Sequence, residues 1–97
     1  MVKRTKFDAA DYLDSPEIIA AYLNEAFATD DAAFISAAIG DVARAKGMAA
    51  VAAETGLGRE SLYKSLNGTT KPEFDTVRRV LESLDVRLVA KAKGNAT

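Results

Sequence analysis

The 97-residue sequence contains no cysteine, no histidine and no tryptophan. Without cysteine, a disulfide framework, a thiolate nucleophile and a cysteine-based metal site are excluded. Without histidine, the chain lacks the side chain best suited to proton transfer at neutral pH and the commonest ligand of transition metals. A zinc site and a Ser-His-Asp triad are therefore excluded, while carboxylate chemistry and a hard-cation site are not. We expect a protein that is not an enzyme and that holds no metal and no cofactor.

Long apolar runs are also missing. No run approaches the roughly 20 residues that span a bilayer, and the basic residues 1–7 are not followed by the apolar core of a signal peptide. We therefore expect a cytoplasmic protein with no membrane partner. A chain of this length forms one domain and buries about 60–65% of its unfolded surface. Nineteen residues are alanine, the best helix former, which favours an all-α fold.

Acidic and basic residues are separated along the chain, although the net charge is only −1. Residues 7–43 contain eight acidic residues and no basic one, whereas residues 44–79 contain seven basic and four acidic residues. Two halves of opposite charge suggest two surfaces that meet different partners. The same charge pattern would arise if the acidic and basic residues only lay on different solvent-exposed helix faces. The interpretation without binding partners therefore also stays open.

Capping residues and apolar spacing predict five helices. The first helix begins with Ser15 as its cap and Pro16 at its first helical position. The second helix ends at the stop signal Gly47. The expected helices run from Ser15-Pro16-Glu17 to about Phe27, from the Thr29-Asp30-Asp31 cap to Gly47, from Met48 to Thr55, from Arg59 to Leu66, and from Glu73 to Leu84.

Apolar spacing also predicts the inward faces and the ends of the chain. Phe34 and Phe74 open the apolar stripes that we expect to face the core in the second and last helices. Residues 86–90 are expected to form a short C-terminal β-strand, because Val86 to Val89 alternates. A lone strand leaves its own backbone donors unpaired, so we expect it to pair, for example with its copy in a dimer. The expected organisation is an N-terminal arm (1–14), a helix-turn-helix domain (15–90) and a flexible tail (91–97).

Residues 48–66 carry the most specific motif, the two short helices of a helix-turn-helix. This motif needs a small residue on its first helix, a residue that tolerates positive φ in the turn, and apolar anchors on both sides. An ordinary helical hairpin would explain a small residue and a glycine in so alanine-rich a chain. The Asn67-Gly68 end and the loop closing on Pro72 favour DNA binding instead. The residues that meet the three requirements are Ala52, Gly56, Val51, Leu57 and Leu62.

Two family resemblances follow from these residues. The stretch Gly56 to Val86 is similar, without a gap, to the Cro/repressor helix-turn-helix family through Gly-Leu-Gly-Arg-Glu-Ser-Leu, Asn-Gly and Lys-Pro-Glu-Phe-Asp-Thr-Val. Over residues 7–90 the chain resembles the HigA-type addiction-module antidote proteins. The matching stretches are 7–15, 21–26, 39–48 and 62–64.

The resemblance implies a five-helix, lambda-repressor-like domain. It further implies a bacterial or prophage type II antitoxin, which binds double-stranded operator DNA as a repressor and neutralises a RelE/ParE-like toxin. Two residues depart from the family pattern. Gly58 stands where serine is usual before the recognition helix, and the polar Ser65 stands where many repressors carry an apolar residue.

In such folds the second short helix lies in the major groove, and its first residues face base edges. Arg59 can pair bidentately with guanine and Glu60 can accept from cytosine. Glu60 can equally be a charge favoured by the helix dipole, and Tyr63 can equally be structural. The expected base contacts are Arg59, Glu60, Ser61, Tyr63 and Lys64. The expected phosphate contacts, which position the protein without reading sequence, are Lys46, Asn67, Thr69, Thr70 and Lys71.

Further partners follow from charge. The basic segment is only modestly positive, so useful affinity requires a homodimer on a palindromic operator; Arg78 and Arg79 are dimer or solvent residues. The acidic half suits a basic, RNA-acting toxin. The expected toxin contacts are Asp8, Asp11, Tyr12, Asp14 and Glu17, unless these acids only solubilise the domain. Two alternatives stay open: a prophage-type regulator without a toxin partner, and an interaction module that has lost DNA binding.

Overall fold

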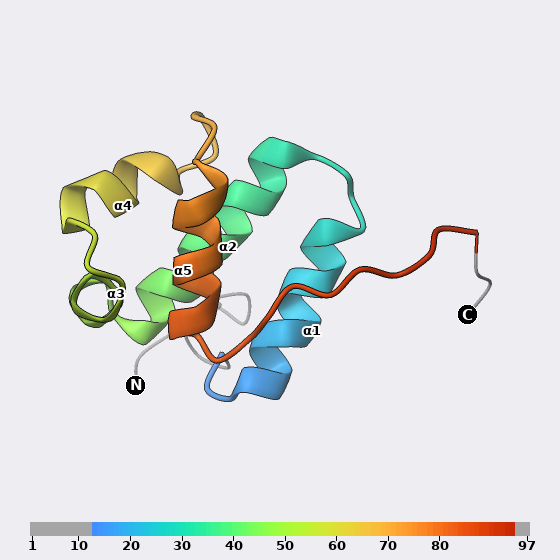
Figure 1. Cartoon of the computed structure of the whole chain (residues 1–97), viewed down its shortest axis with the longest axis horizontal. Helices are drawn as coiled ribbons and strands as arrows, with labels where there is room; N and C mark the ends of the chain where they lie inside the picture. Colours follow the sequence, from blue (N-terminus) through green and yellow to red (C-terminus); the bar gives the residue numbers. More distant parts are fainter. Residues whose placement is uncertain (1–12, 95–97) are drawn as a thin grey trace, which may run out of the picture.

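The computed structural model describes residues 13–94 and shows an all-helical chain (Figure 1). The predicted fold class and the number of helices are confirmed for this range, and each helix end lies within one residue of the expectation. The five helices are α1 (Pro16–Phe27), α2 (Ala32–Lys46), α3 (Met48–Thr55), α4 (Arg59–Ser65) and α5 (Phe74–Ser83).

The first two helices begin at the capping residues that the sequence predicts. The Ser15 hydroxyl accepts a hydrogen bond from the Ile18 N–H at 3.2 Å, and Pro16 occupies the first turn. One carboxylate oxygen of Asp31 accepts from the N–H groups of Ala33 and Phe34 at 3.0 and 3.2 Å. These bonds satisfy donors that have no partner within the helix, which contributes about 1 kcal/mol at each start.

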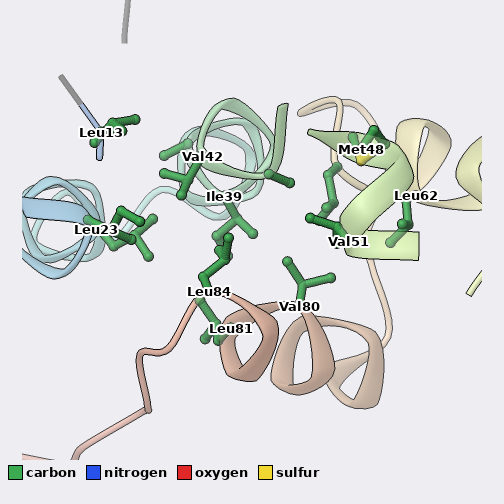
Figure 2. Packing of buried hydrophobic residues seen from close by; sticks show 14 of the residues in the cluster. Leu13, Leu23, Ile39, Val42, Met48, Val51, Leu62, Val80, Leu81 and Leu84 are labelled. Atoms are coloured by element: carbon green, nitrogen blue, oxygen red, sulfur yellow. The ribbon is translucent and has the colours of Figure 1, made fainter. Parts of the chain in front are cut away.

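The core lies between α2 and the helices packed around it. Side chains from all five helical segments meet there, and Figure 2 shows several of them pointing toward one another. Each such side chain gains roughly 1.5–3 kcal/mol on burial, which is the main stabilisation available to so small a domain. The largest fully buried side chains are Leu23, Ile39, Val42, Val51, Leu62, Leu66 and Val80.

The end of α4 packs tightly on the middle of α2. A Cβ atom built on Gly40 would overlap the carbonyl oxygen of Leu66 and lie 3.2 Å from its Cβ. One turn away, the Ser36 hydroxyl donates to the Ser65 carbonyl at 3.1 Å. Leu66 itself is fully buried and supplies an anchor next to the polar Ser65. The absence of a side chain at Gly40 is therefore what lets α4 approach α2.

The expected C-terminal strand is not present in the residues that the structure describes. Residues 86–90 are extended but belong to no strand. The Val86 N–H donates to the Leu81 carbonyl at 3.1 Å, as part of the turn that ends α5. Within residues 13–94 no strand lies beside 86–90, so the alternating residues have no ladder to join there.

Two phenylalanines do not face the core as expected. Phe34 is 53% exposed and Phe74 is 69% exposed. Each lies in the first turn of its helix. Helical spacing predicts the direction in which a side chain points, but not whether another element covers that end of the helix.

Most of the expected N-terminal arm lies outside the described residues. At its end Leu13 is only 6% exposed and packs in the core, whereas Asp14 is exposed. Of the expected tail, residues 91–94 are described, and all four are exposed. Within residues 13–94, no helix combines the length and the apolar character needed to cross a membrane.

Gly40→Ala is expected to lower the free energy of unfolding by about 1–2 kcal/mol. Alanine is favoured over glycine inside a helix by about 1 kcal/mol, but the clash with a backbone carbonyl exceeds that gain, since overpacking costs typically 1–3 kcal/mol or more. Urea denaturation of both proteins measures the difference.

Gly58→Ala is the control, because φ is −75° there and a Cβ would lie 3.8 Å from the Ser61 hydroxyl. We expect a change within about 0.5 kcal/mol, because a weaker cap offsets the reduced freedom of the unfolded chain. Equal stability of Gly40→Ala and the wild-type protein would contradict the close approach of α4 to α2.

Candidate nucleic-acid interface

The link between α3 and α4 is a three-residue turn over 56–58 that starts in a left-handed conformation. Gly56 has φ 78° and ψ 11°, and its N–H donates to the Ala52 carbonyl at 2.9 Å. The predicted positive φ at Gly56 is therefore confirmed. Ala52 and Leu57 are partly buried against the core, where Val51 and Leu62 are fully buried. The turn thus joins two short helices that are both anchored by apolar side chains.

Thr55 and Arg79 hold the end of α3 in place. The Thr55 hydroxyl donates to the Val51 carbonyl at 2.8 Å and accepts from the Leu57 N–H at 3.2 Å. The Arg79 guanidinium donates to the Thr55 carbonyl at 3.1 Å, and its Nε lies 3.0 Å from an Asp75 oxygen. Arg79 is expected from the sequence to be a dimer or solvent residue, and its contact with the end of α3 is an additional role. The Asp75–Arg79 spacing indicates an i,i+4 ion pair, but not the bond to α3.

α4 presents the expected base-contact residues to solvent. Leu62 is fully buried, whereas Arg59, Glu60, Ser61, Tyr63 and Lys64 are all exposed. At 100° per residue, four of the exposed side chains share an arc of about 140° that excludes Leu62: Arg59, Glu60, Tyr63 and Lys64. The helix lies at one edge of the molecule, where no other helix covers its outer side (Figure 1). This face is therefore available to a partner.

Ion pairing separates the seven basic residues of segment 44–79 into two groups. Arg44, Lys46, Arg78 and Arg79 each lie within 4 Å of a carboxylate. Within residues 13–94, the other three basic side chains of segment 44–79 form no ion pair, and all three are exposed. These three are Arg59, Lys64 and Lys71, and they lie on α4 and the loop after it.

The loop 67–72 folds against the end of α4 through its own side chains. The side-chain oxygen Oδ1 of Asn67 accepts from both the N–H and the hydroxyl of Thr69 at 2.8 Å. The Thr70 hydroxyl donates to the Lys64 carbonyl at 2.7 Å. Four of the expected phosphate contacts therefore lie in the loop that directly follows the expected base contacts: Asn67, Thr69, Thr70 and Lys71.

Lys46 is not part of this group. Its ammonium donates to the Ser83 carbonyl at the end of α5 at 2.5 Å and to the Glu54 carboxylate of α3 at 3.3 Å. These bonds connect α2 with α3 and α5. The phosphate contact proposed for Lys46 stays a prediction.

Part of the acidic half of the chain lies on α1 and just before it. Asp14 and Glu17 are exposed, whereas Asp8, Asp11 and Tyr12 lie outside the described residues. After Pro16, the exposed positions of α1 form one stripe at helical spacing: Glu17, Ile18, Ala21, Asn24 and Glu25. Ile18 is 40% exposed, so the stripe combines acidic side chains with one large apolar side chain. The described residues contain no cluster of three or more acidic side chains that could hold a metal ion.

The described residues thus define an all-helical protein that presents an acidic outer face on α1 and an unpaired basic face on α4. The chain belongs to the family of probable addiction module antidote proteins, whose family model matches residues 3–92. It is also 44% identical over 81 residues to an uncharacterized protein of Haemophilus influenzae (strain Rd), covering 84% of each chain. No solved structure was found to match the chain significantly. Family membership supports an antitoxin role and implies a toxin partner in general.

Arg79→Ala is expected to lower the free energy of unfolding by about 1 kcal/mol, because it removes the charge-assisted bond to the Thr55 carbonyl from a half-exposed site. Arg78→Ala is the matched control on the same helix. Arg78 pairs only with the exposed carboxylates of Asp75 and Glu82, at 3.0 and 3.6 Å. We expect that control to change stability by less than about 0.5 kcal/mol. Thermal or urea unfolding of the two variants measures the contrast, and equal losses would count against the Thr55 contact.

Proposed function

We propose that this protein is the antitoxin of a type II toxin–antitoxin module. In this proposal, α3 and α4 form a helix-turn-helix and α4 enters the major groove of operator DNA. Two copies bind the operator together and repress transcription of the module. The outer face of α1 binds a RelE/ParE-like toxin. The observation that carries the DNA-binding part is the grouping of Arg59, Lys64 and Lys71, the three unpaired cations of segment 44–79, on α4 and the loop after it.

This grouping supports DNA binding on energetic grounds. A surface cation without a carboxylate partner contributes little to folding, and neighbouring cations repel one another. DNA phosphates make the same cations favourable, because binding releases the counterions condensed on the DNA and neutralises the charges of both the protein and the phosphates. Arg59 also has the planar guanidinium that recognises guanine bidentately. The exposed Tyr63 and the hydroxyls of Thr69 and Thr70 add groups that bind sugar and phosphate oxygens.

Arg59→Ala is expected to weaken binding to the DNA upstream of this chain's own gene by about 5- to 150-fold, which corresponds to roughly 1–3 kcal/mol for a lost bidentate contact. Lys71→Ala is expected to weaken binding evenly across sequences and to reduce the slope of log K against log salt by about one. Fluorescence anisotropy over a salt series measures both effects.

Arg44→Ala is the control for these variants. Arg44 is an exposed arginine on α2, and it pairs with Asp41 at 2.6 Å. We expect its removal to leave the DNA affinity unchanged. Equal effects of the Arg59 and Arg44 variants, or wild-type binding that does not depend on salt, would contradict the proposed DNA interface.

The proposed toxin surface rests on charge and position. RelE/ParE-like toxins that act on RNA are expected to be basic, so an acidic stripe would attract them and complement their charge. The exposed Ile18 adds a large apolar side chain of the kind that protein interfaces bury. Figure 1 shows α1 and α4 on opposite sides of the molecule. The toxin and DNA would therefore occupy separate surfaces.

The double variant Asp14→Lys/Glu17→Lys is expected to weaken capture of the toxin encoded by the neighbouring gene by at least tenfold, because two attractive charges become repulsive. Co-expression of the two genes followed by pull-down and a titration measures the loss. Glu73→Lys is the control, since Glu73 is an exposed acid before α5 whose side chain caps no backbone group. Unchanged toxin binding by the double variant would show that these acids only solubilise α1.

A further inference from the structure

The dipeptide Asn67-Gly68 opens the loop after α4, and the packing of this loop against α2 favours glycine at its second position. Gly68 has a φ of 84°, a left-handed conformation that glycine adopts without strain. A Cβ atom built on Gly68 would lie 3.3 Å from the Ala33 carbonyl oxygen and 3.3 Å from the Ala37 Cβ, so α2 leaves little room for a side chain. The nitrogen that follows Asn67 therefore belongs to a residue with no side chain to shield it.

The side chain of Asn67 is held by its oxygen alone. Oδ1 accepts from the N–H and from the hydroxyl of Thr69, both at 2.8 Å. Within residues 13–94, the Asn67 Nδ2 makes no hydrogen bond and the Gly68 N–H donates to no acceptor. Asn67 is exposed, so water reaches its amide. The amide carbon of Asn67 and the backbone nitrogen of Gly68 are therefore both free to react.

These two atoms can react with each other, because a bond between them closes a five-membered ring. A base in solution removes the proton of the Gly68 nitrogen, which then forms a bond to the Asn67 Cγ and moves negative charge onto Oδ1. The two donors of Thr69 stabilise that charge, as an oxyanion hole does. Nδ2 takes a proton from solvent, the Cγ–Nδ2 bond breaks, and the nitrogen leaves with the electron pair of this bond as ammonia.

Water then opens the cyclic imide in one of two ways. If it breaks the bond between Cγ and the Gly68 nitrogen, position 67 becomes aspartate. If it breaks the bond between the backbone carbonyl carbon of position 67 and the same nitrogen, position 67 becomes isoaspartate. The net change exchanges ammonia for water without oxidation or reduction. It adds a negative charge and raises the mass of the chain by about 1 Da.

We propose that Asn67 is a site of spontaneous deamidation, and that this reaction limits how long the protein binds DNA. The inference rests on the proposed function, in which the loop 67–72 contacts phosphates. The new carboxylate stands in the same loop as the unpaired Lys71 and repels the phosphates that this loop would bind. Isoaspartate also adds a carbon to the main chain, which displaces Gly68 from α2. The affinity for the operator therefore falls as the protein ages.

Incubation of the full chain in heavy-oxygen water at mildly alkaline pH tests the modification site, with peptide mass spectrometry to follow the incorporated isotope. Asn24 is the control within the same chain. It is also exposed, but it lies inside α1, where the helix holds the N–H of the next residue, Glu25, in its hydrogen-bond ladder. We expect Asn67 to deamidate at least tenfold faster than Asn24. Equal rates at the two asparagines would overturn the proposal.

Thr69→Val tests the stabilisation of the oxyanion. The variant removes the hydroxyl donor and keeps the backbone N–H of position 69. We expect deamidation at Asn67 to slow by about threefold, as is typical for the loss of a neutral hydrogen bond. Circular dichroism checks that the helices are intact. A rate that is unchanged or faster would contradict the role given to Thr69.

The variants Asn67→Asp and Asn67→Ser test the consequence for DNA binding. Both side chains can accept from the N–H of Thr69, so the pair differs mainly in one charge. We expect the aspartate variant to bind the upstream DNA at least tenfold more weakly than the serine variant. During incubation, the wild-type protein should lose affinity in step with its deamidated fraction, whereas the serine variant should keep its initial affinity. Equal affinities of the two variants, or equal losses during incubation, would contradict this consequence.

These measurements separate the modification site from the proposed function, because the deamidation rate is measured without DNA. Selective deamidation of Asn67 in a protein that does not bind the upstream DNA would refute the DNA-binding role and leave the modification site standing. Salt-dependent DNA binding by a protein whose Asn67 is as stable as Asn24 would refute the inference alone.

Discussion

The position of α4 depends on its close packing against α2. A helix of seven residues is too short to be stable by itself, and no side chain caps its start. Leu62 and Leu66 are fully buried, and the missing side chain of Gly40 lets the carbonyl of Leu66 approach α2. With Leu62 turned inward, helical geometry turns Arg59 and Lys64 outward. The orientation of the proposed DNA-reading face is thus a consequence of core packing.

The same domain uses its charges in two different ways. Carboxylates pair with four of the basic residues: Arg44, Lys46, Arg78 and Arg79. Two of these, Lys46 and Arg79, also donate to a backbone carbonyl of another helix, and these bonds connect the helices. The cations of α4 and its following loop take no part in these connections. Most residues of a natural sequence suit the structure around them, and the residues that do not suit it lie mainly at functional sites. An unpaired basic face on a helix held at the edge of the fold is a departure of that kind.

Local signals made most of the fold predictable. Ser15 and Asp31 cap their helices as expected, and Gly56 adopts the positive φ that the turn requires. The failures concern contacts between distant parts of the chain. Spacing could not show that the ends of α2 and α5 leave Phe34 and Phe74 uncovered, or that Arg79 reaches the carbonyl of Thr55. The segment 86–90 is extended as its alternation suggests, but pairing depends on a second strand, and residues 13–94 contain none. The proposed contacts to DNA and toxin remain predictions, because they depend on partners.

The two oxygens of the Asp75 carboxylate serve different surfaces. One lies 3.0 Å from Arg78 on the exposed side of α5, and the other lies 3.0 Å from Arg79, which holds the carbonyl at the end of α3. A new cation that drew this carboxylate away from Arg79 would loosen the support of the turn before α4. Thermodynamic linkage makes such an effect mutual. A ligand bound on that side of α5 and a ligand bound by α4 would then change each other's affinity by the same factor.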